Sequence, residues 1–256
     1  MRVDLPFMPQ RSSKPRTSGL AMVMDKGLSV REAEDLVETA GHLIDYVKLG
    51  FGTSFFTNNL EKKIEIYQKN DIKVYLGGTL FEAFVIRNKF EEYRNFIASL
   101  NIKMVEISDG SMKMDHQQKC NYISKLAEDN LVISEVGSKE AGVVITHKRW
   151  IEMMQNELAA GSQKVIAEAR ESGTVGIYDA KGNADIELIK DILANVPSEK
   201  IIWEAPLKLQ QVWFIKHFGS EVNLGNIAPN EVIALETLRM GLRGDTFMQF
   251  LPDSLK

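Results

Sequence analysis

Eight short runs rich in β-branched residues alternate with longer amphipathic segments, and this alternation restricts the possible folds more than any other feature of the chain. The runs occupy residues 19–24, 44–49, 72–75, 103–107, 131–135, 164–168, 201–204 and 222–224. Their starts are separated by about 20 to 40 residues, which leaves room for one helix between consecutive strands. This pattern is typical of repeated βα units in a parallel sheet.

The segments between the runs carry helix signals. Ser29 and Glu32 form the pattern of a capping box, and apolar residues at helical spacing follow them. A chain of 256 residues with this alternation predicts α/β architecture, a single (β/α)8 TIM barrel over residues 19–256. Residues 1–18 are expected to form a flexible N-terminal arm. An open doubly wound sheet is the alternative, but no Gly-x-Gly-x-x-Gly motif follows the first run.

Composition excludes several functional classes. The chain has 31 basic and 35 acidic residues and a formal charge of −4, which gives no basic footprint for nucleic-acid binding. The single cysteine, Cys120, cannot form an internal disulfide, and Cys-rich zinc sites are excluded. No apolar stretch approaches the ~20 residues of a membrane span, and residues 1–19 lack the apolar centre of a secretory signal. A cytoplasmic location without membrane partners is expected.

Four consecutive predicted strands end in glutamate, at Glu106, Glu135, Glu168 and Glu204. Catalytic groups of (β/α)8 barrels gather at the carboxyl ends of the strands, so these carboxylates are expected to converge. Oxygen ligands without His or Cys suit Mg²⁺ better than zinc. The converging carboxylates are therefore expected to hold Mg²⁺. The alternatives are solvated carboxylates or ion pairs with neighbouring Lys and Arg residues.

Basic residues and glycine-rich turns at the same strand ends indicate an anionic substrate that carries phosphate and carboxylate groups. The predicted substrate-binding residues are Lys26, Lys48, Gly78, Arg170, Lys208, Gly225 and Asn226. The four histidines lie in or beside predicted helices without the spacing of metal ligands.

The strand-end motifs as a set resemble those of the phosphosulfolactate synthase family. The matching segments are residues 24–29, 47–54, 75–82, 105–110, 134–139, 165–173, 204–206, 210–211, 222–227 and 235–243. They keep the same order over roughly residues 17–247, which makes the set far more specific than any one motif.

The resemblance implies a Mg²⁺-dependent, homo-oligomeric (β/α)8 enzyme that adds sulfite to phosphoenolpyruvate and gives (2R)-3-phosphosulfolactate. For this reaction we predict a Mg²⁺ site at Glu106, Glu135 and Glu168. This reaction begins one route to coenzyme M in methanogens and leads to sulfolactate in some bacteria. Ser138 stands where many relatives carry a second lysine, so Lys139 is expected to donate the proton to C2 of the substrate. Two alternatives stay open. One is a non-catalytic stress-response or binding barrel of the same family, and the other is a Mg²⁺-dependent lyase or aldolase acting on another phosphorylated enolpyruvyl acid.

Overall fold

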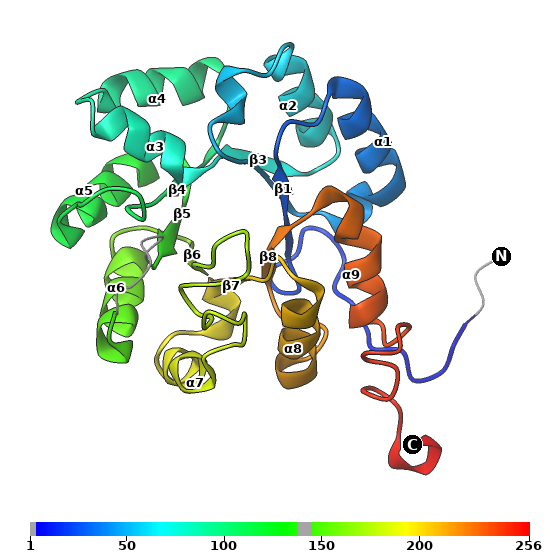
Figure 1. The fold of residues 1–256 in the computed structure, drawn as a ribbon. Coiled ribbons are helices and arrows are strands. Elements are labelled where there is room, and N and C mark those ends of the chain that lie inside the picture. The colour runs from blue at the N-terminus through cyan, green and yellow to red at the C-terminus, as the bar shows by residue number, and fades with distance from the viewer. Residues whose placement is uncertain (1–3, 138–144) are drawn as a thin grey trace.

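The computed structural model describes residues 4–137 and 145–256, in which eight strands form a ring surrounded by helices (Figure 1). The strands are β1 (Ala21–Asp25), β2 (Tyr46–Leu49), β3 (Lys73–Leu76), β4 (Met104–Ile107), β5 (Leu131–Val136), β6 (Lys164–Ala167), β7 (Ile201–Glu204) and β8 (Leu224–Ile227). Each overlaps one of the predicted β-branched runs, so the alternation in the sequence located all eight.

The strands are parallel, and their order in the sheet is β3-β2-β1-β8-β7-β6-β5-β4. β8 pairs with β1, so the first and last strands are neighbours. β3 and β4 stand at the two ends of this order, and no ladder pairs them in the described part of the chain. The result is a nearly closed barrel, which confirms the predicted single (β/α)8 fold.

The helices lie outside the ring (Figure 1). They are α1 (Val30–Ala40), α2 (Leu60–Lys69), α3 (Gly78–Val85), α4 (Phe90–Ser99), α5 (His116–Ala127), α6 (His147–Ala159), α7 (Ile186–Asn195), α8 (Lys208–Phe218) and α9 (Val232–Arg239). Two of them, α3 and α4, lie between β3 and β4, where the repeat needs only one. Among the described residues, no helix is both long and apolar enough to span a membrane.

Two apolar clusters follow from the alternation of side chains along each strand. One lies between the strands and the helices and includes Val23, Val47 and Val105. The other fills the barrel interior with Leu20, Met22, Tyr46, Tyr75, Met104, Ile133, Ile166 and Ile202. This interior cluster closes the barrel and forms an apolar floor beneath the carboxyl ends of the strands.

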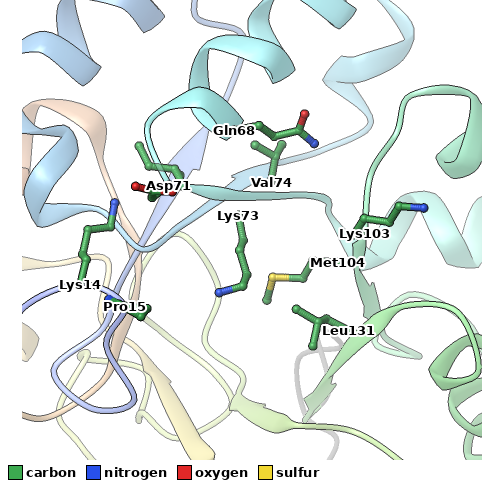
Figure 2. Close-up of a pocket in the computed structure, with 10 residues that line it drawn as sticks. Lys14, Pro15, Gln68, Asp71, Lys73, Val74, Lys103, Met104 and Leu131 are labelled. Atoms are coloured by element: carbon green, nitrogen blue, oxygen red, sulfur yellow. The ribbon is translucent and has the colours of Figure 1, made fainter.

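The N-terminal arm lies at the amino ends of the strands. Arg11 forms ion pairs with Glu221 and Glu236, and Arg16 pairs with Asp45 at 3.1 Å. Figure 2 shows a cavity at this end, with Lys14 and Pro15 of the arm on one side and Met104 and Leu131 on the other. Its volume is about 440 Å³. None of the predicted site residues that the structure describes borders this cavity, since they lie at the opposite ends of the strands.

Candidate active site

Five charged side chains point inward at the carboxyl ends of the strands. Each lies two residues after a member of the interior apolar cluster, so strand alternation directs it into the barrel. The five are Lys48 after Tyr46, Glu106 after Met104, Glu135 after Ile133, Glu168 after Ile166 and Glu204 after Ile202. All are buried, with Lys48 the most exposed at 6%. The four glutamates predicted to converge therefore all lie at this end of the barrel, and three of them surround one lysine.

Lys48 lies between three of the carboxylates. Its Nζ is 2.9 Å from Oε1 of Glu106, 3.1 Å from Oε2 of Glu135 and 3.7 Å from Oε1 of Glu204. A buried ammonium with several carboxylate partners is held in one place, because leaving any charge unpaired in the interior is costly. Lys48 is therefore a fixed centre of the cluster.

Glu106 has a second partner outside the barrel interior. The backbone N–H of Gly78 donates to Oε1 of Glu106 at 2.6 Å, so this carboxylate lies at the N-terminus of α3. A Cβ on residue 78 would lie only 2.4 Å from Oγ of Ser108 and 2.9 Å from the Glu106 carboxylate. Glycine is thus required for this close approach. The N–H of Gly78, predicted to contact phosphate, is used by the protein itself.

Glu135, Glu168 and Glu204 are close enough to share one cation. Their carboxylate oxygens lie within 4.8 Å of one another, and all three side chains are buried. Glu204 is further fixed by the N–H of Ala169, which donates to its Oε2 at 2.8 Å. The group contains two of the three predicted Mg²⁺ ligands and adds Glu204. Glu106, the third predicted ligand, is held by Lys48 and Gly78 instead.

Burial dominates the electrostatics of these carboxylates. It raises the pKa of Glu204 to about 8, because the negative charges of Glu135 and Glu106 add to the desolvation that Lys48 only partly offsets. Desolvation also raises the pKa of Glu106. For Lys48, burial opposes the charge, but the neighbouring glutamates outweigh it and raise its pKa well above the ordinary value. Among the described residues, four carboxylates and one ammonium form this cluster, and burial favours the protonated forms of Glu106 and Glu204.

A cavity of about 420 Å³ lies over the cluster, at the carboxyl ends of the strands. Its walls are formed by Met24, Lys48, Phe51, Gly77, Thr79, Ser111, Glu135, Glu168, Ala169, Arg170, Glu171, Ser172, Glu204 and Asn226. The cavity thus places a guanidinium and an ammonium beside four carboxylates, those of Glu135, Glu168, Glu171 and Glu204. Such a site can hold a small anion and a cation together.

Comparison with known proteins identifies the family. Residues 9–245 match the model of (2R)-phospho-3-sulfolactate synthase (ComA). The chain belongs to the phosphosulfolactate synthase family. It is 45% identical over 236 residues to the phosphosulfolactate synthase of Methanocaldococcus jannaschii, with 90% of this chain and 94% of that protein covered. It is 40% identical over 243 residues to the phosphosulfolactate synthase of Bacillus subtilis, with 94% and 96% covered. The protein is therefore an enzyme of the phosphosulfolactate synthase type.

Similarity to solved structures supports the fold alone. The 3-hexulose-6-phosphate synthase of Salmonella typhimurium matches with a TM-score of 0.56 at 11% identity, over 88% of this chain and all of that one. The 3-keto-L-gulonate-6-phosphate decarboxylase of Vibrio cholerae matches with a TM-score of 0.53 at 11% identity, over 92% of this chain and all of that one.

The basic residues predicted to bind substrate differ in their surroundings. Arg170 borders the cavity, and within residues 4–137 and 145–256 its side chain forms no ion pair. Lys26 pairs with Glu171, and Lys208 pairs with Asp245 at 2.9 Å. Neither lysine borders the cavity over the glutamates. Of these three cations, Arg170 is therefore the one placed to meet a ligand.

Gly225 and Asn226 have different roles in the structure. Asn226 borders the cavity and has a left-handed backbone with φ of 60°. A Cβ on Gly225 would lie 2.6 Å from Cε of Met22 and 3.0 Å from Cγ2 of Ile202, so this glycine packs against the barrel interior. Lys139, the predicted proton donor, lies outside the described residues.

Sequence reasoning missed some of the residues that shape the site. Ser111 and Phe51 border the cavity but were not singled out. Glu82, buried on α3, accepts hydrogen bonds from the hydroxyl of Ser108 and, at 2.7 Å, from the N–H of Ser111. The polar run that follows β4 was the available signal for Ser111. The position of Glu82 depends on α3, and this helix was not predicted because Gly77 and Gly78, at its start, indicate a turn.

Proposed function

We propose that this protein catalyses the Mg²⁺-dependent addition of sulfite to phosphoenolpyruvate to give (2R)-3-phosphosulfolactate. The supporting observation is the convergence of Glu135, Glu168 and Glu204 beside Lys48, in a cavity that Arg170 also borders. A negatively charged cluster for a cation and a nearby guanidinium suit a substrate with both carboxylate and phosphate groups. Membership of the phosphosulfolactate synthase family favours this reaction over others that suit such a site.

The reaction needs charge stabilisation and one proton. The sulfur lone pair of sulfite forms a bond to C3 of phosphoenolpyruvate, and the electrons of the C2–C3 double bond move to C2 and into the carboxylate. A proton then adds to C2, and the bond between C2 and the phosphate oxygen stays intact. Negative charge is greatest before protonation, so the site must stabilise that charge where it develops.

The three carboxylates fit Mg²⁺. All of their ligand atoms are oxygens, and these atoms lie within 4.8 Å of one another. When bound, Mg²⁺ would supply positive charge beside the carboxylate of the substrate. Glu135, Glu168 and Glu204 would hold the ion. Lys48 would keep Glu135 and Glu204 in place.

We assign the remaining roles as follows. Arg170 binds the phosphate, since a guanidinium offers paired donors to phosphate oxygens. Asn226 borders the same cavity and contributes a polar contact. Lys26 directly follows β1 and forms an exposed ion pair with Glu171. We propose that Lys26 contributes to sulfite or phosphate binding when this ion pair breaks. Lys139 follows β5 in the sequence, and we propose it as the donor of the proton to C2.

We also propose that the protein forms a homo-oligomer. Several large apolar side chains are exposed, with Phe56 at 89% and Leu209 at 73% the most exposed among them. Exposed apolar side chains of this size are typical of association surfaces when they group together. Light scattering during size-exclusion chromatography measures the mass directly. A monomer at micromolar concentration would contradict the proposal.

The test of function is an assay of the purified protein with phosphoenolpyruvate, sulfite and Mg²⁺. Loss of the enol absorbance and the appearance of a new phosphorus resonance should both require all three components. Excess EDTA should abolish turnover, and Mg²⁺ should restore it. The Glu168→Gln variant should stay folded and lose most activity. Full turnover in EDTA would exclude the metal requirement, and failure to consume phosphoenolpyruvate would exclude the reaction.

A further inference from the structure

A fully buried lysine lies outside the barrel, behind the site. Lys119 is on α5 and has no exposed surface. Its Nζ is 2.8 Å from Oδ1 of Asp109 and 2.8 Å from Oε1 of Glu157, and it donates to the backbone carbonyl of Glu135 at 2.6 Å. Burial opposes the charge, but the two carboxylates outweigh it and raise the pKa of Lys119 above the ordinary value. The group is therefore an ammonium with three partners.

These three contacts join separate parts of the fold. Asp109 follows β4, Glu157 is on α6, and Glu135 is on β5 next to β6. On β5, next to Glu135, the hydroxyl of Ser134 accepts from the hydroxyl of Ser162 at 2.7 Å. One ammonium thus fixes two helices to the carboxyl ends of two strands.

Glu135 is held from both sides of the barrel wall. On the inside, its carboxylate lies 3.1 Å from Nζ of Lys48 and within reach of Glu168 and Glu204. On the outside, its carbonyl accepts from Lys119. The side chain of a strand residue can keep its place only if its backbone is fixed. Hydrogen-bond partners behind metal ligands typically change metal affinity or activity by 10–100-fold when they are removed.

We propose that Lys119 is a positioning residue of the active site, which fixes the backbone of Glu135 and so sets its carboxylate among Glu168 and Glu204. Two of its tests, enzyme activity and Mg²⁺ affinity, rest on the proposed function. A third test, hydrogen–deuterium exchange of the backbone around Glu135, is independent of that function. A purely structural ion pair would contribute to the stability of the fold without a specific effect on the position of the Glu135 carboxylate.

A second buried cation provides the control for stability loss alone. Arg239 on α9 is 1% exposed and donates to the carbonyls of Val222 at 2.7 Å and Leu20 at 3.1 Å, at the amino ends of β8 and β1. It resembles Lys119 in burial and in its backbone partners, but it lies at the end of the barrel away from the glutamates. The Arg239→Met variant should therefore be destabilised without a specific effect on the site.

The variants of Lys119 separate positioning from folding. Lys119→Met leaves two buried carboxylates without a cation, so this single variant risks misfolding. The Lys119→Met/Glu157→Leu double variant replaces the buried pair by apolar groups of similar size, and it still removes the contact with the Glu135 carbonyl. Lys119→Arg keeps the charge and should restore at least part of that contact.

The experiment compares the double variant, Lys119→Arg and Arg239→Met with the wild type, well below the melting temperature of each. In the double variant we expect faster hydrogen–deuterium exchange at residues 133–137, at least tenfold weaker Mg²⁺ binding by calorimetry, and kcat reduced by 10- to 100-fold. Lys119→Arg should recover most of each property, and Arg239→Met should keep all three.

Wild-type exchange at residues 133–137 together with wild-type Mg²⁺ affinity in the double variant would overturn the proposal. An equal loss in Arg239→Met would overturn it as well, because the effect would then follow stability. If the wild type neither binds Mg²⁺ nor turns over, the proposed function fails. The exchange comparison alone then decides whether Lys119 fixes the backbone of Glu135.

Discussion

Arg170 differs from the other cations near the mouth of the barrel in having no ion-pair partner among the described residues, although Glu171 is adjacent to it in sequence. Glu171 pairs with Lys26, which leaves the Arg170 guanidinium directed to the cavity that it borders. A guanidinium in this setting binds a phosphate without first breaking another ion pair. Its contribution to substrate binding should therefore exceed those of Lys26 and Lys208.

Replacement of this residue should have a large kinetic effect. Hydrogen bonds to charged groups contribute about 1.5–3 kcal/mol each, so Arg170→Ala should lower kcat/KM for phosphoenolpyruvate by roughly 10- to 100-fold. Most of the change should appear in KM. Steady-state kinetics measures the loss, and Lys190→Ala on the exposed face of α7 is the control for removing a positive charge. Equal kinetics in the two variants would assign Arg170 a role outside phosphate binding.

His116 links the buried network of Lys119 to pH. Its Nδ1 lies 3.7 Å from Oε1 of Glu157, and burial, Lys119 and Arg149 together lower its pKa below the ordinary value. The folded protein thus favours the neutral ring. The stability that this group contributes is present above about pH 6.5, the ordinary pKa of histidine, and is lost as the pH falls through the lower folded value.

The His116→Asn variant should remove this part of the pH dependence. Between pH 8 and pH 5 the wild type should lose stability on acidification, and the variant should lose less. Chemical denaturation at several pH values measures the difference. His42→Asn serves as the control, because His42 lies in the turn between α1 and β2 and not in the network of Lys119. Parallel curves for the wild type and His116→Asn would contradict the assignment.

At the scale of elements, the start of α1 was predicted from four residues. Ser29 Oγ accepts from the N–H of Glu32 at 3.3 Å, and the N–H of Ser29 donates to Oε2 of Glu32 at 2.7 Å, as in a capping box. Local signals of this kind are readable because both partners lie within one turn of the chain. The start of α3 was missed because its hydrogen-bond partner is distant in the sequence. Gly77 and Gly78 indicate a turn locally, and the partner of the Gly78 N–H is Glu106, 28 residues away.

The capping box predicts a measurable loss on mutation. Ser29→Ala removes the side-chain acceptor, and it should lower the free energy of unfolding by about 1 kcal/mol. Urea denaturation gives this value, with Ser254→Ala as the control at an exposed serine near the C-terminus. Activity should stay near the wild-type level, since α1 covers the outside of the barrel. A change within 0.3 kcal/mol (about the error of such fits) would show that the cap is dispensable.

At the scale of the whole molecule, the order of the strands was predictable because parallel strands joined by one helix have short, right-handed connections. That rule places β1 to β8 in sequence around the barrel, and the pairing of β8 with β1 joins the last strand to the first. The rule does not reveal that β3 and β4 lack a ladder, since two helices rather than one join them. It also cannot show which of the strand-end glutamates place their carboxylates within 4.8 Å of one another. Glu135, Glu168 and Glu204 come from three strands, and only their tilt and register bring these carboxylates together.

The buried negative charge should couple metal binding to the stability of the entire barrel. Because the carboxylates converge only in the folded chain, Mg²⁺ should bind the folded state and hardly bind the unfolded one. A free concentration 100 times the dissociation constant then stabilises the fold by about 2.7 kcal/mol. For a chain of this size, that corresponds to a rise of about 5 to 10 °C in melting temperature.

Scanning calorimetry with Mg²⁺ and with EDTA measures this rise, at constant ionic strength so that simple screening does not contribute. Glu168→Gln removes one carboxylate from the group, so its melting temperature should respond much less to Mg²⁺ than that of the wild type. An equal response in the two proteins would place the Mg²⁺ effect elsewhere on the molecule, and the absence of any response at saturating Mg²⁺ would contradict a metal site at the carboxyl ends of the strands.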